Sequence, residues 1–478
     1  MHEFDLFVIG TGPAGQRAAV QAAKLGKSVG ICERREVVGG VCINTGTIPS
    51  KTFREAVLYL TGFQQRGTYG ADHPLRETIT MQDLLGRVDL VIRRETQVIR
   101  DQMRRNRVRL IAGEASFTGP RELIVRGAQE TVTVRADHVV IAVGTVPATP
   151  PDVQTDGETV ITSDELMGLK EIPRTMTVVG AGVIGVEYAS MFAALGVEVS
   201  LVDQRPRLLD FVDAEIAESL SYQMRNMNCV FRLGEEVASV NIEGPRRAVA
   251  NLRSGKKIVS ELLLYSIGRI GATRSLNLEA AGLTADERGR LRVNDRLQTP
   301  VPHILAAGDV IGFPALASTS MEQGRLAACQ AFGVACPSMP HLFPYGIYSV
   351  PEISMVGQHE AELTNAGVPY EVGVARYREI ARGAILGDDS GLLKILFHRQ
   401  TRRILGVHII GTGATELVHI GQAVMAFGGT IDYFVEAVLN YPTFAECYKV
   451  AALDGYNKVG PPPGAPPPPG SGLHAATS

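Results

Sequence analysis

The feature that most constrains this chain is an internal repeat of one glycine-rich unit. The stretch DLFVIGTGPAGQRAAVQAAKLGKSVGICER, which begins at Asp5, can be laid over MTVVGAGVIGVEYASMFAALGVEVSLVDQ, which begins at Met176. The glycines, leucines and acidic residues of the two copies then coincide: Gly10, Gly12, Gly15, Leu25, Gly26 and Glu33 meet Gly180, Gly182, Gly185, Leu195, Gly196 and Asp203. The chain is therefore expected to build one supersecondary unit twice.

Each copy has the pattern of a dinucleotide-binding turn. A short apolar strand, residues 7–9 or 177–179, runs into GxGxxG and then into a helical pattern. The first glycine permits a tight turn, the second lets the backbone approach a pyrophosphate, and the third allows close packing of helix on strand. The helix N-terminus adds a positive dipole. A lone GxGxxG is a weak signal, but strand, helix and acidic residue agree in both copies, so we predict two dinucleotide sites.

The acidic residues of the repeat bear on which dinucleotide binds. Glu33 and Asp203 are each expected to accept hydrogen bonds from an adenosine ribose, and Asp203 alone favours NAD because a 2′-phosphate would meet a carboxylate. Arg205 and Arg207 follow at once in DQRPR and can reach a phosphate. Two interpretations stay open, namely a site that takes both NAD and NADP, or a surface cluster of charges.

The order of strand and helix signals predicts the fold class. A helical segment at 49–107 separates the copies, and the β-type stretches RLIAGEASF, DHVVIAVGTVP, LLLYSIGR and HILAAGDVIG extend the sheets. This pattern predicts an α/β protein with two doubly wound, Rossmann-like domains, the second inserted into the first. From His341 onward strands and helices are mixed, as in an α+β domain. The run GPPPGAPPPPGSGLHAATS is too rich in proline and glycine to pack and is expected to be disordered.

Composition argues against several classes of partner. The chain has 47 Lys and Arg against 50 Asp and Glu, a net charge of −3 that gives no bulk attraction for nucleic acid or an anionic membrane. The arginine-rich stretch 93–109 carries helically spaced apolar residues, so we interpret it as the solvated face of a helix. MHEFDLFVIG lacks the features of a signal peptide or membrane span, so a cytoplasmic protein is expected. The six cysteines have no metal-ligand spacing, and we predict no metal site.

Several motifs together resemble the FAD-dependent pyridine nucleotide-disulfide oxidoreductases, the family of lipoamide dehydrogenase and glutathione reductase. They are GTGPAG with Glu33, GGVCINTGTIPSK, VVIAVGTVP, GAGVIGVE, SIGR, and HILAAGDV followed by PALASTSMEQGRLA. The resemblance reaches to Lys458 and implies FAD in the first copy and NAD(P) in the second. It implies FAD-binding segments at 1–149 and 271–340, an NAD(P)-binding domain at 150–270 and a dimerisation domain at 341–459, with the disordered tail at 460–478.

The resemblance also assigns roles to matched residues. Asp309 matches an aspartate that hydrogen-bonds the ribityl or phosphate part of FAD. The segment from Ala315 to Thr319, which includes the expected cofactor-binding residue Ala317, would open a helix whose positive end points at the flavin. Lys51 matches the lysine beside flavin N5, where it pairs with Glu187; the plainer interpretation is an ordinary salt bridge between domains. The cofactor sites are also expected to include two glycines of the VVIAVGTVP and SIGR motifs, Gly144 and Gly268.

One stretch departs from the family pattern. Disulfide-using relatives have CxxxxC across the flavin, whereas GGVCINTGTIPSK has Cys42 and places Thr47 where the second cysteine would stand. A hydroxyl cannot take part in a dithiol–disulfide couple. The family's HPxxxE segment is changed as well, because NYPTFAE has Tyr441 in place of the histidine and retains Glu446. We expect Cys42 to be an inert thiol at the flavin, and Glu446 and Cys447 to be structural.

Within the family, these departures resemble the soluble NAD(P) transhydrogenases. That resemblance implies that NADPH delivers hydride to FAD, that NADP leaves, and that NAD enters the same site to collect the hydride. The segment from His341, including FPYGIYSVPEISMVG, implies a homodimer or a larger homo-oligomer. Two alternatives stay open: an NAD(P)H-dependent reductase of quinones, dyes or peroxide, and a scaffold that has lost the dithiol chemistry.

Overall fold

The computed structural model describes residues 1–63, 78–150, 152–336 and 338–460. By their contacts these residues form two compact units, which we call the N-terminal unit (1–61, 78–206 and 228–341) and the C-terminal unit (62–63, 207–227 and 342–460). The segment 207–227 follows the second repeat along the chain but belongs to the C-terminal unit. The tail expected to be disordered, 460–478, lies outside the described residues apart from Gly460.

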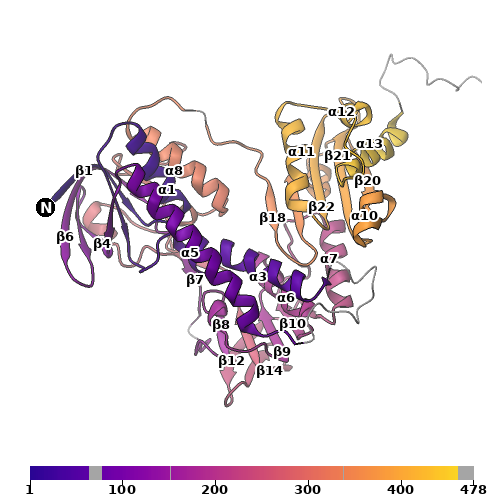
Figure 1. The fold of residues 1–478 in the computed structure, drawn as a ribbon, viewed down its shortest axis with the longest axis horizontal. Helices are drawn as coiled ribbons and strands as arrows, with labels where there is room; N and C mark the ends of the chain where they lie inside the picture. The colour runs from indigo at the N-terminus through magenta and orange to yellow at the C-terminus, as the bar shows by residue number, and fades with distance from the viewer. Residues whose placement is uncertain (64–77, 151, 337, 461–478) are drawn as a thin grey trace, which may run out of the picture. The chain divides into compact units, whose positions relative to one another are not determined.

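The first copy of the repeat builds the larger sheet of the N-terminal unit (Figure 1). Its strands are β1 (His2–Ile9), β2 (Val29–Glu33), β3 (Arg109–Ala112), β4 (Glu114–Gly119), β5 (Glu122–Arg126), β6 (Thr131–Ile141) and β17 (Ile304–Ala306). The order is β3-β2-β1-β6-β5-β4, with β17 also paired to β6. β1 lies parallel to both neighbours, with Val8 opposite Ile31 and Val140. Its last four residues are all buried, as expected of a parallel strand covered on both faces.

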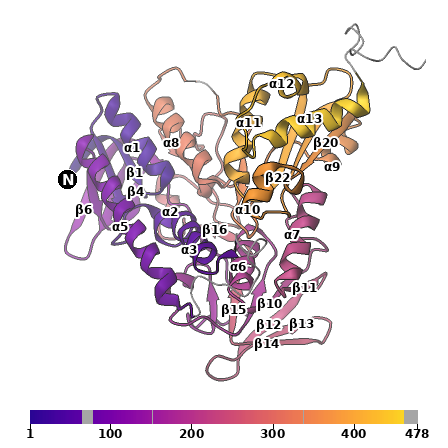
Figure 2. The same cartoon turned by 45° about the vertical axis from the view of Figure 1, so that its right-hand side comes forward.

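Helices cover this sheet and position the cavity described below. The helices of the N-terminal unit are α1 (Pro13–Lys24), α2 (Gly40–Asn44), α3 (Thr47–Leu60), α5 (Met81–Arg105), α6 (Val183–Ala194) and α8 (Ala317–Ala331). α1 and α8 lie side by side (Figure 2). Their close approach depends on Gly324, where a Cβ would stand 2.0 Å from the carbonyl oxygen of Ala14. The first turn of α1 thereby packs against the middle of α8.

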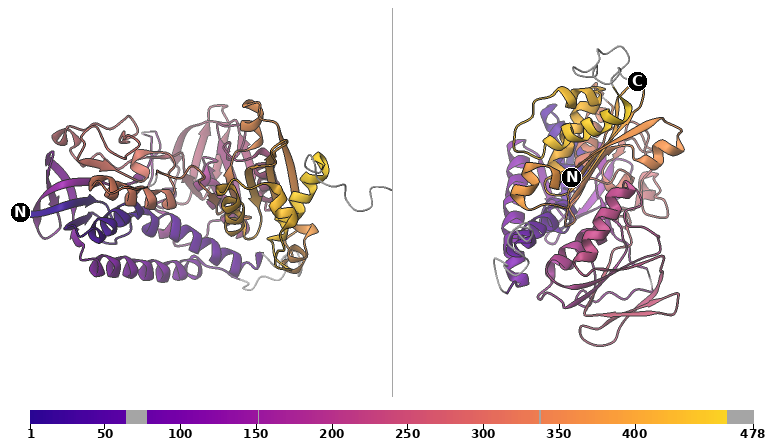
Figure 3. Two further views of the ribbon diagram at one scale, coloured as in Figure 1. Left: turned by 90° about the horizontal axis from the view of Figure 1, so that it is seen from above. Right: turned by 90° about the vertical axis from the view of Figure 1, so that its right-hand side faces the viewer.

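The helix α5 shows why its arginine-rich sequence is compatible with a packed fold. It begins with a capping box, in which Thr80 and Asp83 exchange side-chain and backbone hydrogen bonds. Met81, Leu84 and Val88 are among its buried residues, whereas most of its arginines are exposed. α5 packs along α3, as Figure 3 shows. The basic residues therefore lie on the solvated face of this helix.

The second copy of the repeat builds a smaller parallel sheet in the same unit. Its strands are β8 (Val160–Thr162), β9 (Thr175–Val179), β10 (Glu198–Asp203), β11 (Val230–Leu233) and β15 (Leu262–Tyr265), in the order β11-β10-β9-β15-β8. A three-stranded antiparallel sheet comprises β12 (Val237–Ile242), β13 (Ala248–Leu252) and β14 (Lys257–Ser260). Ten of the twelve residues of α6 are buried. The helix is therefore internal, and its buried residues include the charged Glu187 as well as apolar side chains.

A two-stranded ribbon and several single turns complete the N-terminal unit. The ribbon pairs β7 (Thr145–Pro147) antiparallel with β16 (Arg269–Gly271), so Gly144 and Gly268, which precede these strands, lie at its opposite ends. The 3₁₀ turns are η2 (Leu166–Gly168), η3 (Leu278–Ala281) and η4 (Asp309–Ile311).

The C-terminal unit is an antiparallel sheet with helices on both faces. Its strands are β18 (Tyr345–Ile347), β19 (Ile353–Gly357), β20 (Tyr370–Arg376), β21 (Leu392–His398) and β22 (Ile404–Ile410), in the order β18-β19-β22-β21-β20. Its helices are α7 (Ala214–Asn226), α9 (Glu360–Asn365), α10 (Ala381–Leu386), α11 (Ala414–Ala426), α12 (Ile431–Glu436) and α13 (Glu446–Val459), with the turn η5 (Tyr377–Glu379). α11 and α13, in yellow tones, cover one face, and α7, in magenta, lies on the other (Figure 3, right). The two Rossmann-like sheets and this α+β unit confirm the predicted fold class.

A buried lysine ties α7 to the sheet of the C-terminal unit. Lys394, on β21, is fully buried, and its Nζ donates to Asp213 at 2.9 Å, to Glu215 at 3.1 Å and to Glu360. Among the described residues these carboxylates are the one group spaced to hold a metal ion. The ammonium group already binds all three, so the cluster is the counter-charge of a lysine.

No helix in the described part of the chain combines the length and the apolar character that crossing a membrane requires.

Candidate active site

The first glycine turn has the geometry of a phosphate cradle. Gly10 has φ of +102°, and a Cβ there would lie 2.5 Å from the carbonyl oxygen of Ala142. A Cβ on Gly15 would lie 1.9 Å from the carbonyl oxygen of Gly10, so only glycine lets α1 begin this close to β1. A Cβ on Gly12 would meet nothing within 4 Å. The turn is therefore tight behind and open in front, where a pyrophosphate would approach the helix N-terminus.

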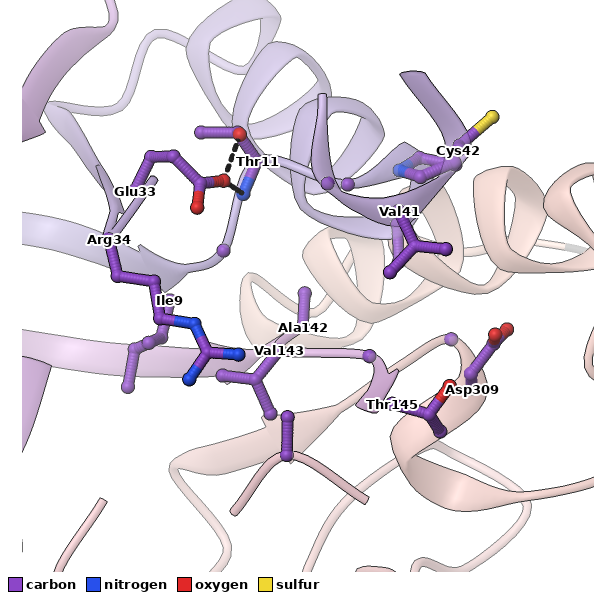
Figure 4. Close-up of a pocket in the computed structure, with 18 of the residues that line it drawn as sticks. Ile9, Thr11, Glu33, Arg34, Val41, Cys42, Ala142, Val143, Thr145 and Asp309 are labelled. Carbon is purple, nitrogen blue, oxygen red and sulfur yellow. Dashed lines mark hydrogen bonds between the residues drawn. The ribbon is translucent and has the colours of Figure 1, made fainter. Parts of the chain in front are cut away.

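Glu33 ends β2 beside this turn and is held in place by hydrogen bonds. It is 7% exposed, and Figure 4 shows its carboxylate bonded to Thr11. Oε2 accepts from the Thr11 hydroxyl and from the Thr11 backbone N–H at 3.2 Å, while Oε1 accepts from the Arg35 N–H at 3.0 Å. Thr11, which the sequence did not single out, therefore fixes the orientation of this carboxylate.

A single cavity joins most of the residues predicted to bind FAD. It encloses about 1090 Å³, including the part open to solvent, and extends from the first glycine turn to the segment after β17. The predicted residues that line it are Gly10, Gly12, Glu33, Cys42, Thr47, Gly144, Asp309 and Ala317. Gly15, Lys51 and the residues of the second repeat do not line it. Its length and its polar contacts at one end fit a dinucleotide better than a small metabolite.

Asp309 and the start of α8 form the other polar end of the cavity. The carboxyl of Asp309 points into the cavity in Figure 4, and the Ser320 hydroxyl donates to it at 3.4 Å. Burial raises the pKa of Asp309, and the charge of Arg269 opposes the rise. α8 begins at Ala317, so its N-terminal N–H groups lie at the cavity wall. A buried acceptor and a helix N-terminus suit the hydroxyl and phosphate groups of FAD.

Cys42 and Thr47 lie together in the cavity wall. Cys42 belongs to α2, Thr47 is the first residue of α3, and their side chains share a hydrogen bond. Burial raises the pKa of Cys42, which favours the protonated thiol. All six cysteines are among the described residues, and none of them forms a disulfide bond there. Cys32 also lines the cavity, but it stands beside Glu33, and burial raises its pKa to about 12.

Lys51 and Glu187 form a bidentate ion pair between α3 and α6. Nζ lies 2.9 Å from Oε1 and 2.8 Å from Oε2, and the Glu187 side chain is 5% exposed. Nζ also donates to the Ser50 hydroxyl at 3.3 Å, and Ser50 hydrogen-bonds Tyr188. Phe53 and Phe192 stack between the same helices with ring centroids 5.8 Å apart. The pair is therefore held by packing as well as by charge, and sequence reasoning missed Ser50 and Tyr188.

The second glycine turn repeats the geometry of the first. Gly180 has φ of +110°, and a Cβ on it would lie 2.8 Å from the carbonyl oxygen of Ser266. A Cβ on Gly185 would lie 1.9 Å from the carbonyl oxygen of Gly180. In front of Gly182 the nearest atom to such a Cβ is Arg205 Nη2, at 3.9 Å. The guanidinium group of Arg205 therefore lies in front of the second glycine turn.

Asp203 is paired with Arg205 at the end of β10. Arg205 donates from Nε at 3.0 Å and from Nη2 at 2.8 Å, and the backbone N–H of Ala181 donates to Asp203 at 2.6 Å. Burial raises the pKa of Asp203, but hydrogen bonds from Arg205 and Ala181 outweigh it and hold the pKa below its usual range. Arg207 is exposed and belongs to the C-terminal unit. The structure thus brings one of the two predicted arginines onto the acidic residue.

The ribbon β7–β16 carries the remaining predicted glycines. Gly144 and Gly268 have φ of +65° and +89°. Arg269, beside Gly268, donates to the Thr145 hydroxyl at 2.9 Å and to Asp164 at 3.2 Å. Sequence reasoning did not identify this arginine network, because its members are far apart along the chain.

In the C-terminal unit, Tyr441 is 72% exposed. Cys447 is fully buried, and burial raises its pKa to about 12. Oε2 of Glu446 is buried and has no hydrogen-bond partner among the described residues.

Comparison with known proteins adds independent information. The family model described as pyridine nucleotide-disulphide oxidoreductase matches residues 4–324, and its dimerisation domain matches residues 343–452. A soluble pyridine nucleotide transhydrogenase of Mycobacterium bovis is 56% identical over 461 residues, 96% of this chain and 98% of that protein. One from Colwellia psychrerythraea is 44% identical over 464 residues, 96% of this chain and 99% of that protein.

Solved structures agree with the family match. LpdA from Mycobacterium tuberculosis superposes with a TM-score of 0.86 at 25% identity, covering 95% of this chain and 99% of that one. The Cu(II) complex of the HOCl-induced flavoprotein disulfide reductase RclA from Escherichia coli has a TM-score of 0.86 at 26% identity, with the same coverage.

Proposed function

The chain belongs to the pyridine nucleotide-disulphide oxidoreductase family, and we propose that it is an FAD-dependent enzyme that transfers hydride between NADPH and NAD. The two dinucleotides use one shared nicotinamide site in succession. This proposal draws on the 56% identity to a soluble pyridine nucleotide transhydrogenase over nearly the whole chain. NAD and NADP are the substrates in this account, and no nucleic acid or membrane partner is invoked.

The observation that carries the proposal is the Cys42–Thr47 contact. A disulfide-reducing relative needs two sulfurs at this place to pass electrons to its substrate, and here the partner of the thiol is a hydroxyl. Among the described residues that line the cavity the other cysteine is Cys32, which is 1% exposed and stands beside Glu33, whereas the side chain beside Cys42 is that of Thr47. Electrons that enter from one dinucleotide therefore leave to another.

The residues of the chain supply binding and orientation. FAD, when bound, takes up a hydride from one nicotinamide and releases it to the other. The first glycine turn, Glu33 and Asp309 would hold it along the cavity. Lys51, fixed by Glu187, would place a positive charge beside the reacting edge of the flavin ring. Asp203 with Arg205 would receive the adenosine end of either nicotinamide dinucleotide.

We assign residues 1–149 and 271–340 to FAD binding, 150–270 to NAD(P) binding, and 341–459 to dimerisation in a homodimer or larger homo-oligomer. The match of the dimerisation-domain model to residues 343–452 supports the last of these. A cytoplasmic location is part of the proposal.

Steady-state kinetics test whether one site serves both dinucleotides. Initial rates measured at several fixed NAD concentrations while NADPH is varied should give parallel double-reciprocal lines, because each half-reaction is complete before the next begins. Intersecting lines would show that both dinucleotides are bound at once and would overturn the single shared site. No turnover with NAD, but rapid oxidation of NADPH by a quinone, would favour an outward-directed reductase instead.

A further inference from the structure

The C-terminal end of α8 brings two cysteines together. Cys329 lies in the last turn of the helix, and Cys336 follows the point where the chain reverses. Gly333 adopts φ of +65°, and the backbone N–H of Val334 donates to the Cys329 carbonyl at 2.9 Å. This left-handed glycine and the backward hydrogen bond are the marks of a Schellman ending. The chain after α8 therefore folds back over the turn that carries Cys329.

The two cysteines are brought close together at this reversal. Cys336 Sγ accepts from Gln330 Nε2 at 3.6 Å, which places the sulfur against the last turn of α8, beside the residue that follows Cys329. After burial, the largest influence on the pKa of Cys329 is Cys336, which raises it. Cys329 is 2% exposed, whereas Cys336 is partly exposed. One sulfur of the pair is therefore open to a small molecule in solution, and the other lies behind it.

A cation stands near both sulfurs. Arg325, one helical turn before Cys329, interacts electrostatically with both cysteines. It is itself paired with Glu322, with Nε at 2.9 Å from the carboxylate. Burial raises the pKa of Cys329, and the charge of Arg325 acts against that rise. A nearby arginine favours the thiolate form, which is the form that attacks a disulfide.

We propose that Cys329 and Cys336 are a redox modification site at which the chain forms a reversible intramolecular disulfide. The oxidant is a low-molecular-weight disulfide. The Cys336 thiolate attacks one of its sulfurs, the S–S bond breaks, and one small thiol leaves. The Cys329 thiol then loses its proton and attacks the Cys336 sulfur, so that the second small thiol leaves. Two protein thiols are oxidised and one small disulfide is reduced to two thiols.

The other cysteines provide internal controls. Cys32 and Cys447 are buried, and burial raises their pKa values to about 12, so both should remain unreacted. Cys42 is partly exposed like Cys336, but its contact is the hydroxyl of Thr47. Any reaction at Cys42 would therefore stop at a mixed disulfide. The site at the end of α8 is distinguished from Cys42 by having a second sulfur.

The test is to treat the FAD-loaded protein with oxidised glutathione, block the remaining thiols by alkylation and identify the modified peptides by mass spectrometry. We expect loss of both the Cys329 and Cys336 thiols, a disulfide between them and no glutathione retained on either. Glutathione retained on Cys336 beside a free Cys329, or both thiols left free, would overturn the proposal.

Two variants make the test specific. Cys329→Ser should convert the product into a stable glutathione adduct on Cys336, and Cys336→Ser should leave Cys329 free because it is buried. If Cys336→Ser loses the Cys329 thiol as quickly as the wild-type protein does, the assigned order of attack is wrong. FAD absorbance checks that each variant is folded. The readout is independent of hydride transfer, so it stands apart from the proposed function.

Discussion

Replacing Arg205 with glutamine should weaken the use of NADPH far more than the use of NADH. Arg205 is the cation that neutralises Asp203 at the second glycine turn, through hydrogen bonds of 2.8 and 3.0 Å. Without it, a 2′-phosphate would approach an uncompensated carboxylate. NADH carries a ribose hydroxyl at that position and meets no such repulsion.

The magnitude can be worked from these charges. A phosphate of charge about −2 at about 5 Å from a carboxylate costs about 7 kcal/mol at an effective dielectric of about 20. A guanidinium at a similar distance offsets most of that cost. The Arg205 side chain is 35% exposed, so solvent screens part of its charge. We therefore expect a loss of about 2 kcal/mol, or roughly thirtyfold in kcat/KM for NADPH.

The assay is the anaerobic reduction of the bound flavin, followed by stopped-flow absorbance with NADPH or NADH as the only donor. Asp203→Asn is the matched variant, because it removes the carboxylate and leaves the arginine. It should shift preference in the opposite direction, toward NADPH. Equal losses with both donors in Arg205→Gln would refute the reasoning and would mean that the arginine only stabilises the turn.

Three further predictions concern the flavin cavity, the C-terminal unit and acid stability. Thr47→Cys places a second sulfur beside Cys42, where the two could form a disulfide. In an anaerobic titration with dithionite the variant should then take up one more electron pair per flavin than the wild-type protein does. An unchanged uptake would show that the two side chains cannot be bridged. Lys394→Met leaves the carboxylates of Asp213, Glu215 and Glu360 without their buried cation. The free energy of unfolding, measured in urea, should fall by about 3–5 kcal/mol. A fall of less than about 1 kcal/mol would contradict a buried ion-pair role. Hydrogen bonds from Arg174 hold the pKa of Glu261 at about 2, so its contribution to stability is present above the unfolded pKa of about 4 and is lost as the pH falls toward 2. The urea midpoints of wild type and Glu261→Gln should therefore converge on acidification, and a constant gap would be inconsistent with this linkage.

Features fixed by local backbone geometry could be predicted from the sequence. The glycines at 10, 15, 180 and 185 stand where a Cβ would collide with backbone atoms. Only glycine fits such a position, so it can be recognised in the sequence. The alternation of strands and helices likewise predicted both Rossmann-like sheets. The Lys51–Glu187 pair joins residues 136 positions apart, and it was expected only because both belong to motifs of a recognisable family.

Contacts that depend on tertiary packing could not be predicted from the sequence in this way. The sequence assigned 150–270 as a whole to NAD(P) binding and did not indicate that α7 packs on the sheet of the C-terminal unit, where Lys394 binds Asp213. The network of Arg269 with Thr145 and Asp164 depends on the pairing of two short strands distant in sequence. The closeness of Cys329 to Cys336 depends on the reversal at Gly333. Arg205 was singled out as a phosphate ligand, but its bidentate pairing with Asp203 was visible only in the structure.

The most direct test of the account is an anaerobic experiment in two steps. The purified protein is reduced with NADPH, free nucleotide is removed, and NAD is added while flavin absorbance and NADH formation are followed. Rapid recovery of the oxidised flavin spectrum with stoichiometric NADH is the predicted result. A flavin that stays reduced with NAD, and is reoxidised only when a quinone or a peroxide is added, would contradict transhydrogenation.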